Sequence, residues 1–274
     1  MPEALYTAIP VWQAAVLGAV QGLGEFLPVS SSAHLILTPW FLGWTDPGLT
    51  FDVALHVGTL LAVLSVFGKD WIGLALAALR PAAEPGKARL FWRIAAASVP
   101  GAAMGLALEH KAEHAFRSPL LLAATLAGMG LALWWMDRRG SKTRALEDLS
   151  LGESLLIGLA QGVAVVPGVS RAGITMAVAL GLGLRREEAA RFSFLLSTPI
   201  IAGAAALKMR HMLRVPPHAD LVVGTLVAGV VGLLSIRFLL RYLKTGSFTP
   251  FAVYRCLLAA AVVAWHLAGH PAAS

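Results

Sequence analysis

The sequence predicts an all-α integral membrane protein built as an inverted-topology repeat, with six transmembrane spans and two re-entrant regions. The chain of 274 residues is 57% hydrophobic and only 14% charged, and its mean hydropathy is +0.72. An ordinary soluble domain carries about 25% charged residues. Six apolar runs are long enough to cross a bilayer, which requires roughly 20 residues. Two further apolar regions are each interrupted by Pro, Gly and Ser.

The six predicted spans lie at about 50–68, 90–108, 118–136, 191–209, 220–241 and 249–268. Charged or Pro-rich links at 80–89, 137–148 and 210–220 separate most of them. The interrupted regions lie at about 11–43 and 152–184, and each splits into two runs too short to cross a bilayer. Such broken runs are typical of re-entrant hairpins, whose irregular backbone is covered by protein or lines a cavity.

The two interrupted regions resemble each other at a shift of 140 residues. "LGAVQGLGEFLPVSSSAH" (17–34) aligns with "IGLAQGVAVVPGVSRAGI" (157–174). The identical pairs are Gly18 and Gly158, Gln21 and Gln161, Gly22 and Gly162, Val29 and Val169, and Ser30 and Ser170. A single membrane domain, residues 1–274, would thus contain two halves at about 11–137 and 152–268. Because each half has three spans, an odd number, the second half should enter the membrane upside down relative to the first.

Charge and cysteine content exclude other classes of protein. The formal net charge of +7 is typical of cytoplasmic loops and lipid headgroup contacts in a membrane protein. Nucleic-acid binding is not expected, because no basic stripe with aromatic residues is present. The single cysteine, Cys256, excludes an internal disulfide.

Both interruptions carry polar residues suited to binding an anion. The half-helix beginning at Ser30-Ser31-Ser32 would present unpaired backbone N–H groups and hydroxyls. The second break, "PGVSRAGIT" at 167–175, has the same form and adds Arg171, whose planar guanidinium suits phosphate. Inverted-repeat proteins place their sites where broken helices meet near the midplane. We therefore expect Glu25, His34 and Arg171 to share one pocket for a highly charged oxyanion.

Within this pocket, the spacing suggests a hydrolase. Ser31 could act as nucleophile and His34, one helical turn later, as its base. Glu25 could orient the imidazole or hold a divalent cation, and Arg171 could stabilise the phosphoryl charge. Two further ionisable residues lie in the spans. His56 could reach the pocket or simply pack within its span, and Arg255 is expected to extend to lipid headgroups.

These motifs resemble those of the undecaprenyl-pyrophosphate phosphatases, a family also tied to bacitracin resistance. The family's first motif, (E/Q)xxxE running into LPVSS with a nearby His, is matched by Gln21, Glu25, Ser30, Ser31 and His34. Its second motif, PGxSRSxxT, is matched by Pro167, Gly168, Ser170, Arg171 and Thr175, with Ala172 in place of the family's second serine. Further stretches that look familial, such as "FSFLLSTP" (192–199) and "FAVYRCLLA" (251–259), extend the resemblance over nearly the whole chain.

The resemblance implies a bacterial inner-membrane enzyme that removes the terminal phosphate of undecaprenyl pyrophosphate and so recycles the lipid carrier of cell-wall synthesis. It implies an active site on the periplasmic side, assisted by Mg²⁺ or Ca²⁺, with the lipid substrate and the bilayer as partners. The expected catalytic residues are Ser31, His34, Glu25 and Arg171, with Glu25 also the candidate metal ligand. The expected phosphate-binding residues are Ser30, Ser32, Ser170, Gly168, Thr175 and Gln21. The oligomeric state is left open, a dimer included.

The sequence leaves three alternatives open. His34 could itself be the nucleophile, through a phosphohistidine, or a metal-bound water could attack directly. In a different class, a secondary transporter or lipid flippase would use the same anion site for a substrate in transit. A carrier would need charge complementarity but no nucleophile, so Ser31 and His34 beside Glu25 favour the phosphatase.

Overall fold

The computed structural model describes residues 6–114, 118–212 and 218–269, and in this part of the chain helices joined by loops make up the fold, without a β-strand. The helices are α1 (Val11–Phe26), α2 (Ser31–Leu42), α3 (Leu49–Leu79), α4 (Pro85–His114), α5 (Pro119–Arg139), the 3₁₀ helix η1 (Leu146–Asp148), α6 (Leu151–Val163), α7 (Arg171–Gly181), α8 (Arg186–Met212), α9 (Ala219–Tyr242) and α10 (Thr249–Leu267). The predicted all-α class is confirmed.

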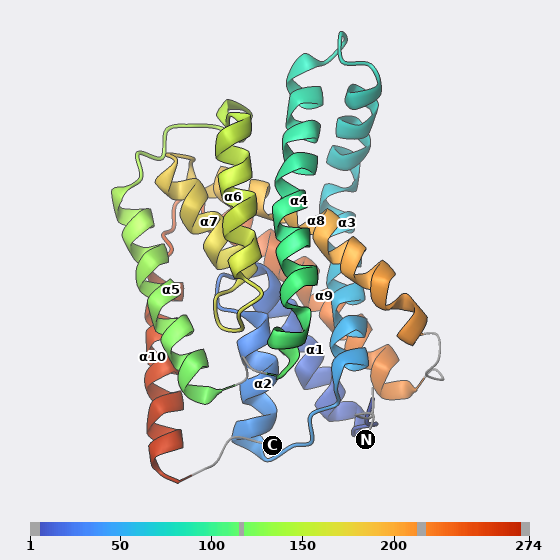
Figure 1. Cartoon of the computed structure of the whole chain (residues 1–274), viewed down its shortest axis with the longest axis vertical. Coiled ribbons are helices and arrows are strands. Elements are labelled where there is room, and N and C mark those ends of the chain that lie inside the picture. The colour runs from blue at the N-terminus through green and yellow to red at the C-terminus, as the bar shows by residue number, and fades with distance from the viewer. Residues whose placement is uncertain (1–5, 115–117, 213–217, 270–274) are drawn as a thin grey trace.

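Six of the described helices are long and apolar enough to cross a membrane: α3, α4, α5, α8, α9 and α10. They coincide with the six predicted spans, and the protein is therefore a multi-pass membrane protein. The main difference is that α3 runs to Leu79 rather than ending near residue 68. No proline interrupts residues 69–79, so the helix continues up to the link at 80–89. As a result, α3 and α4 project beyond the other helices at one end of the molecule (Figure 1).

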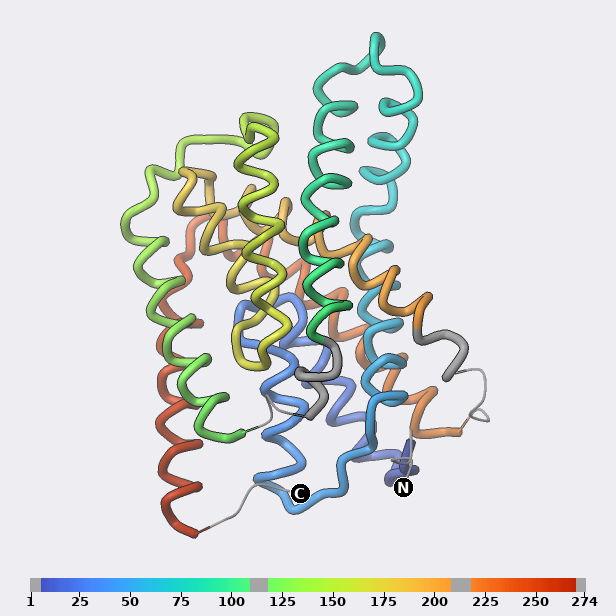
Figure 2. The backbone as a smooth tube through the Cα atoms, in the orientation of Figure 1, coloured from blue at the N-terminus to red at the C-terminus, as the bar shows by residue number. Residues whose placement is uncertain are grey.

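The remaining helices form two short hairpins, α1–α2 and α6–α7. The hairpins enter the bundle from opposite ends, and their loops meet near the middle of the molecule (Figures 1 and 2). In Figure 2, α3 climbs from the end of the molecule where α1 begins, whereas α8 descends from the end where α6 begins. The two halves of the chain therefore run in opposite senses, which agrees with the expected inverted arrangement.

Each hairpin packs against a helix of the other half. Helix α1 lies along α9, and helix α6 lies along α4. Glycines at equivalent positions make this close packing feasible. A Cβ on Gly18 would lie 2.4 Å from the carbonyl oxygen of Gly224, and one on Gly158 would lie 2.0 Å from that of Ala97. The repeat visible in the sequence is therefore also a repeat of packing contacts.

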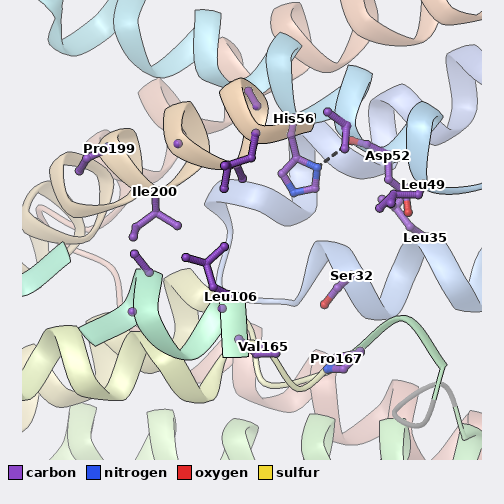
Figure 3. Close-up of a pocket in the computed structure, with 18 of the residues that line it drawn as sticks. Ser32, Leu35, Leu49, Asp52, His56, Leu106, Val165, Pro167, Pro199 and Ile200 are labelled. Carbon is purple, nitrogen blue, oxygen red and sulfur yellow. Dashed lines mark hydrogen bonds between the residues drawn. The ribbon is translucent and has the colours of Figure 1, made fainter. Parts of the chain in front are cut away.

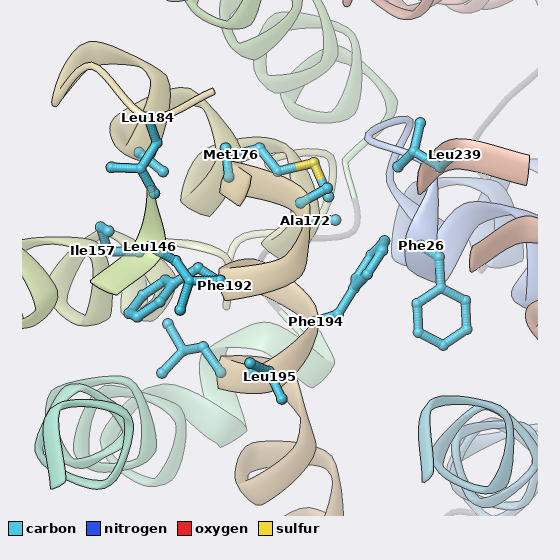
Figure 4. Packing of buried hydrophobic residues seen from close by; sticks show 14 of the residues in the cluster. Phe26, Leu146, Ile157, Ala172, Met176, Leu184, Phe192, Phe194, Leu195 and Leu239 are labelled. Carbon is cyan, nitrogen blue, oxygen red and sulfur yellow. The ribbon is translucent and has the colours of Figure 1, made fainter. Parts of the chain in front are cut away.

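The largest hydrophobic cluster joins the two halves around α8. Phe192, Phe194 and Leu195 of α8 pack with Ile157 of α6 and with Phe26 at the end of α1 (Figure 4). The rings of Phe26 and Phe194 meet edge to face, with centroids 5.5 Å apart. Because Phe26 is fully buried, the end of α1 is fixed in the core, and the position of the preceding residue, Glu25, is fixed with it.

Candidate active site

The two hairpin loops end in the same local structure. Ser30 and Ser170 both have positive φ angles, 81° and 71°. Each serine hydroxyl accepts a hydrogen bond from the backbone N–H three residues later, from Ala33 at 3.4 Å and from Gly173 at 3.1 Å. Helices α2 and α7 then begin at Ser31 and Arg171. Two helix N-termini, with their partial positive charge, are thereby brought to the middle of the molecule.

Glu25 is the centre of the polar contacts between these loops. Its carboxylate pairs with the guanidinium of Arg171 from the other half. Oε2 also accepts hydrogen bonds from the Ser31 hydroxyl at 2.9 Å and from Nε2 of Gln21 at 3.2 Å. The side chains of Glu25 and Arg171 are only 4% and 18% exposed. The structure therefore unites Glu25, Ser31 and Arg171, and links Gln21 to them.

A cavity of about 230 Å³ lies against this cluster. Its lining includes Glu25, Ser31, Ser32, Ser170 and Arg171. The cavity thus brings a serine hydroxyl, a carboxylate, a guanidinium and two helix N-termini to one small volume. This combination suits a group with several negatively charged oxygens.

His34 occupies a different position from the one the sequence suggested. Its Nδ1 lies 2.7 Å from the carbonyl oxygen of Ser30, and its Nε2 lies 2.7 Å from the hydroxyl of Tyr254. Because a carbonyl only accepts, Nδ1 carries the proton and Nε2 accepts from Tyr254. Both ring nitrogens are thus occupied, and the hydrogen-bond acceptor of Ser31 is Glu25 rather than His34. In this geometry His34 fixes the loop and lies outside the cavity lining.

The other expected phosphate ligands divide into two groups. Ser32 lines the cavity, with its hydroxyl 3.2 Å from that of Ser30. Thr175 is fully buried and its hydroxyl contacts the carbonyl of Arg171 and the hydroxyl of Ser193, so the structure does not bring it into the cavity. Gly168 shapes the second loop through a φ of 91°.

The position of Arg255 differs most clearly from the one that the sequence predicts. It was expected to extend to the headgroups, but it is 0% exposed. Its guanidinium donates to the carbonyls of Pro28 at 3.1 Å, Gly168 at 2.6 Å and Val169 at 3.1 Å. Both loops leave carbonyls without helical partners, and a buried arginine with five donors can satisfy several of them. Arg255 therefore ties the first loop to the second.

His56 is a second residue that sequence reasoning left undecided. Its Nε2 lies 3.7 Å from Oε2 of Glu25, its Nδ1 lies 2.7 Å from the carbonyl oxygen of Asp52, and the ring lines the cavity. An ionisable residue inside a predicted span was the available signal. Its contact partner could not be read from the sequence, because α1 and α3 meet only in the tertiary structure.

An apolar groove of about 500 Å³ opens beside the polar cavity. Figure 3 shows its walls, with Leu35 and Leu49 near His56, and Leu106, Val165 and Ile200 on the other side. The groove and the cavity share seven lining residues: Ser32, His56, Gly101, Gly105, Val165, Ile200 and Ala204. A polar head and an apolar chain of one ligand could therefore occupy the two spaces together.

The oxygen atoms of Glu25 and Gln21 are too few to hold a divalent cation by themselves, so a substrate would have to supply further ligands. In the described part of the chain, no cluster of three or more His, Cys, Asp or Glu residues is arranged to hold a metal. Glu25 offers a carboxylate, and Oε1 of Gln21 is buried without a hydrogen-bond partner. Mg²⁺ is commonly held in this way, by one or two carboxylates together with substrate phosphates.

Fold and site together define a class: a multi-pass membrane protein with a polar cavity, chemically suited to an anion, between two short helical hairpins. The chain belongs to the BacA family, since the family model described as bacitracin resistance protein BacA matches residues 14–261. The chain is similar to an undecaprenyl-diphosphatase from Moorella thermoacetica, with 56% identity over 93% of this chain and 97% of that protein. Undecaprenyl-diphosphatases from Pelotomaculum thermopropionicum and Desulforudis audaxviator are 50% and 48% identical, over 92% and 90% of this chain and 96% and 95% of their own lengths.

Proposed function

We propose that this protein hydrolyses the terminal phosphate of undecaprenyl pyrophosphate, giving undecaprenyl phosphate and inorganic phosphate. The reaction would recycle the lipid carrier of cell-wall synthesis and contribute to bacitracin resistance. The names of the relatives support the substrate. The observation that carries the chemistry is the contact of one carboxylate, Glu25, with both the Ser31 hydroxyl and the Arg171 guanidinium.

The pyrophosphate would bind in the polar cavity and the prenyl chain in the adjoining groove. Arg171 and the N-termini of α2 and α7 would bind the oxygens of the terminal phosphate. Because a phosphate competes with Glu25 for Arg171, substrate binding would release the carboxylate from its ion pair. Glu25 could then accept a proton from Ser31, which already donates to it.

In the first step, the Ser31 oxygen attacks the terminal phosphorus. The Oγ–P bond forms, the bridging P–O bond breaks, and the serine proton passes to Glu25. Undecaprenyl phosphate leaves without needing a proton, since the second pKa of a phosphate monoester is roughly 6. In the second step, water hydrolyses the phosphoserine. Arg171 stabilises the phosphoryl charge in both steps.

His34 would support this chemistry by holding the Ser30 carbonyl and so the start of α2. The alternative in which His34 is the nucleophile requires Nε2 to leave the Tyr254 hydroxyl. The two routes differ in the residue that carries the phosphoryl group. Phosphoserine is stable in acid, whereas phosphohistidine is stable in base and labile in acid.

A divalent cation, Mg²⁺ or Ca²⁺, would be held by Glu25 and Gln21 together with substrate oxygens. When bound, it would neutralise charge on the pyrophosphate. We place the protein in the bacterial inner membrane with the site open to the periplasmic side, as in the family it resembles. Activity in the presence of EDTA, Mg²⁺ or Ca²⁺ tests the cation.

The first experiment measures phosphate release from undecaprenyl pyrophosphate by the purified full chain in detergent. Wild type should release phosphate, and Ser31→Ala and Arg171→Ala should lose turnover while keeping their helical content. Gln13→Met, at a half-buried position of α1 away from the site, serves as the control. If folded wild type binds the lipid but releases no phosphate with either cation, the hydrolase proposal is wrong and transport becomes the better explanation.

A further inference from the structure

Gln161, in the last turn of α6, is a buried amide outside the set of residues to which the proposed reaction gives a role. It is 4% exposed, and neither Oε1 nor Nε2 has a hydrogen-bond partner among the described protein atoms. Burying an unpaired polar group costs about 1–3 kcal/mol. Its counterpart in the first half, Gln21, instead donates its amide to Glu25. The two equivalent residues therefore have different surroundings, and only Gln161 has both amide atoms available to a ligand.

The packing around Gln161 fixes its amide at the polar cavity. Gln161 lines this cavity together with Ser31, Glu25 and Arg171. Gly101 of α4 lines the same cavity, and a Cβ placed on it would lie 2.7 Å from Nε2 of Gln161. The amide thus occupies the space that any side chain at position 101 would fill. Gly101 and Gln161 both line the cavity, so the amide lies against α4 at the cavity wall.

The chemistry of the cavity assigns different partners to the two amide atoms. Phosphate oxygens accept hydrogen bonds at neutral pH, so Nε2 can bind a phosphoryl oxygen. Oε1 needs a donor, but the hydroxyl of Ser31 and the guanidinium of Arg171 are directed at Glu25. Water is a donor small enough for the remaining space, and it is also the second reactant of a hydrolase. A glutamine that orients the attacking water is a known solution in phosphoryl transfer.

We propose that Gln161 binds the phosphoryl group through Nε2 and positions the hydrolytic water through Oε1. The inference rests on the proposed phosphatase function and concerns its second step. The water oxygen forms a bond to phosphorus while the bond from Ser31 Oγ to phosphorus breaks. Glu25 first releases to solvent the proton that it took from Ser31 in the first step; one water proton then passes to Glu25 and from there to the departing Ser31 oxygen. Hydrogen phosphate keeps the other proton, so atoms and charge balance.

The test is Gln161→Met, which keeps the volume of the side chain but removes both amide atoms. With undecaprenyl pyrophosphate labelled at the terminal phosphate, we expect turnover to fall about 100-fold, the order seen for removal of one transition-state hydrogen bond. Because the second step is slowed, labelled phosphoserine should accumulate after acid quenching. Gln13→Met should retain wild-type turnover and show no added label.

Gly101→Ala tests the same amide without altering it. The new Cβ would displace Nε2, and we expect lower turnover with more retained label. This variant also serves if Gln161→Met does not fold. If both folded variants turn over within two-fold of wild type and retain no added label, the role of Gln161 is wrong while the phosphatase stands. If wild type releases no phosphate, the function fails, and the inference fails with it.

Discussion

The hydroxyl of Ser31 donates a 2.9 Å hydrogen bond to Oε2 of Glu25, six positions earlier in the chain and across the first loop. Loss of this carboxylate should therefore remove the proton acceptor of the proposed nucleophile, Ser31. We expect Glu25→Gln to lower kcat by about 10²–10⁴-fold, the usual contribution of a general base. The substitution keeps the side-chain shape, so the helical content should be unchanged. Steady-state phosphate release measures the effect.

His34→Gln is the informative comparison. Because both nitrogens of His34 contact Ser30 and Tyr254, we expect a smaller loss of kcat than in Glu25→Gln. The reverse order, with Glu25→Gln nearly active and His34→Gln inactive, would assign the base to His34. Labelled phosphohistidine in the wild type would assign the nucleophile to it.

Arg255 should be essential for the relative placement of the two loops. Arg255→Met would leave the carbonyls of Pro28, Gly168 and Val169 buried without their donor. Each unpaired group costs about 1–3 kcal/mol, so we expect the free energy of unfolding to fall by about 3 kcal/mol or more. Arg255→Lys keeps the charge but not the planar fork, and should fold with reduced kcat. Thermal unfolding in detergent and phosphate release measure the two effects.

The control for Arg255 is Arg93→Lys. Arg93 is partly exposed and donates to one carbonyl, that of Glu147, at 3.0 Å. We expect Arg93→Lys to retain wild-type kcat and nearly the wild-type melting temperature. If Arg255→Lys behaved in the same way, the connection between the loops would not depend on the guanidinium geometry.

Local sequence was sufficient to predict the elements around the site but not their mutual contacts. The helix starts after Ser30 and Ser170 follow from Pro, Gly and Ser patterns that act within a few residues. The meeting of Glu25 with Arg171 followed from the general rule that broken helices of inverted repeats meet. The contacts of Arg255 and His56 depend on partners in other helices, so an ionisable residue within a span could mark them as candidates but could not show what they contact. Likewise, the preference of Ser31 for Glu25 over His34 depends on how Tyr254 of α10 holds the imidazole.

Gly168 should be sensitive to substitution for two reasons. Its φ of 91° is unfavourable for residues with a side chain, and an added Cβ would lie 2.0 Å from Oγ1 of Thr125. We expect Gly168→Ala to lower the free energy of unfolding by about 2 kcal/mol or more and to reduce turnover. Gly152→Ala, in α6 with nothing within 4 Å of the new Cβ, should be neutral. Equal melting temperatures for the two variants would contradict the strained loop.

Glu153, at the outer end of α6 and away from the six spans, should make stability depend on pH. Hydrogen bonds from Arg144, at 2.7 and 3.0 Å, and from the Ser150 N–H lower the pKa of Glu153 to about 2. Because the folded-state pKa lies below the ordinary value of 4.5, the stabilisation is fully present above about pH 4.5. It is lost as the pH falls from 4.5 towards 2. For this partly exposed pair we expect about 1 kcal/mol.

The measurement is the melting temperature in detergent as a function of pH. Glu153→Gln should melt below wild type at pH 7, and the difference should shrink at pH 3. Glu147→Gln, at an exposed neighbouring position, should show little difference at either pH. A gap between wild type and Glu153→Gln that stays constant from pH 7 to pH 3 would exclude the proposed ion pair as its source.

The apolar groove should determine how strongly the length of the prenyl chain affects binding. Gly203 of α8 lines the groove, and no atom lies within 4 Å of a Cβ placed there. The ring of Gly203→Phe would occupy space proposed for the chain. At about 25 cal/mol per Å², loss of roughly 60 Å² of apolar contact should raise KM about 10-fold. We expect this rise with undecaprenyl pyrophosphate but not with a short prenyl pyrophosphate, with kcat unchanged for both.

Gly73→Phe, whose Cβ site on α3 is equally open but outside the groove, should leave both KM values unchanged. Equal KM changes for long and short chains in Gly203→Phe would show that the chain binds elsewhere, since only contact along the groove makes the effect depend on length.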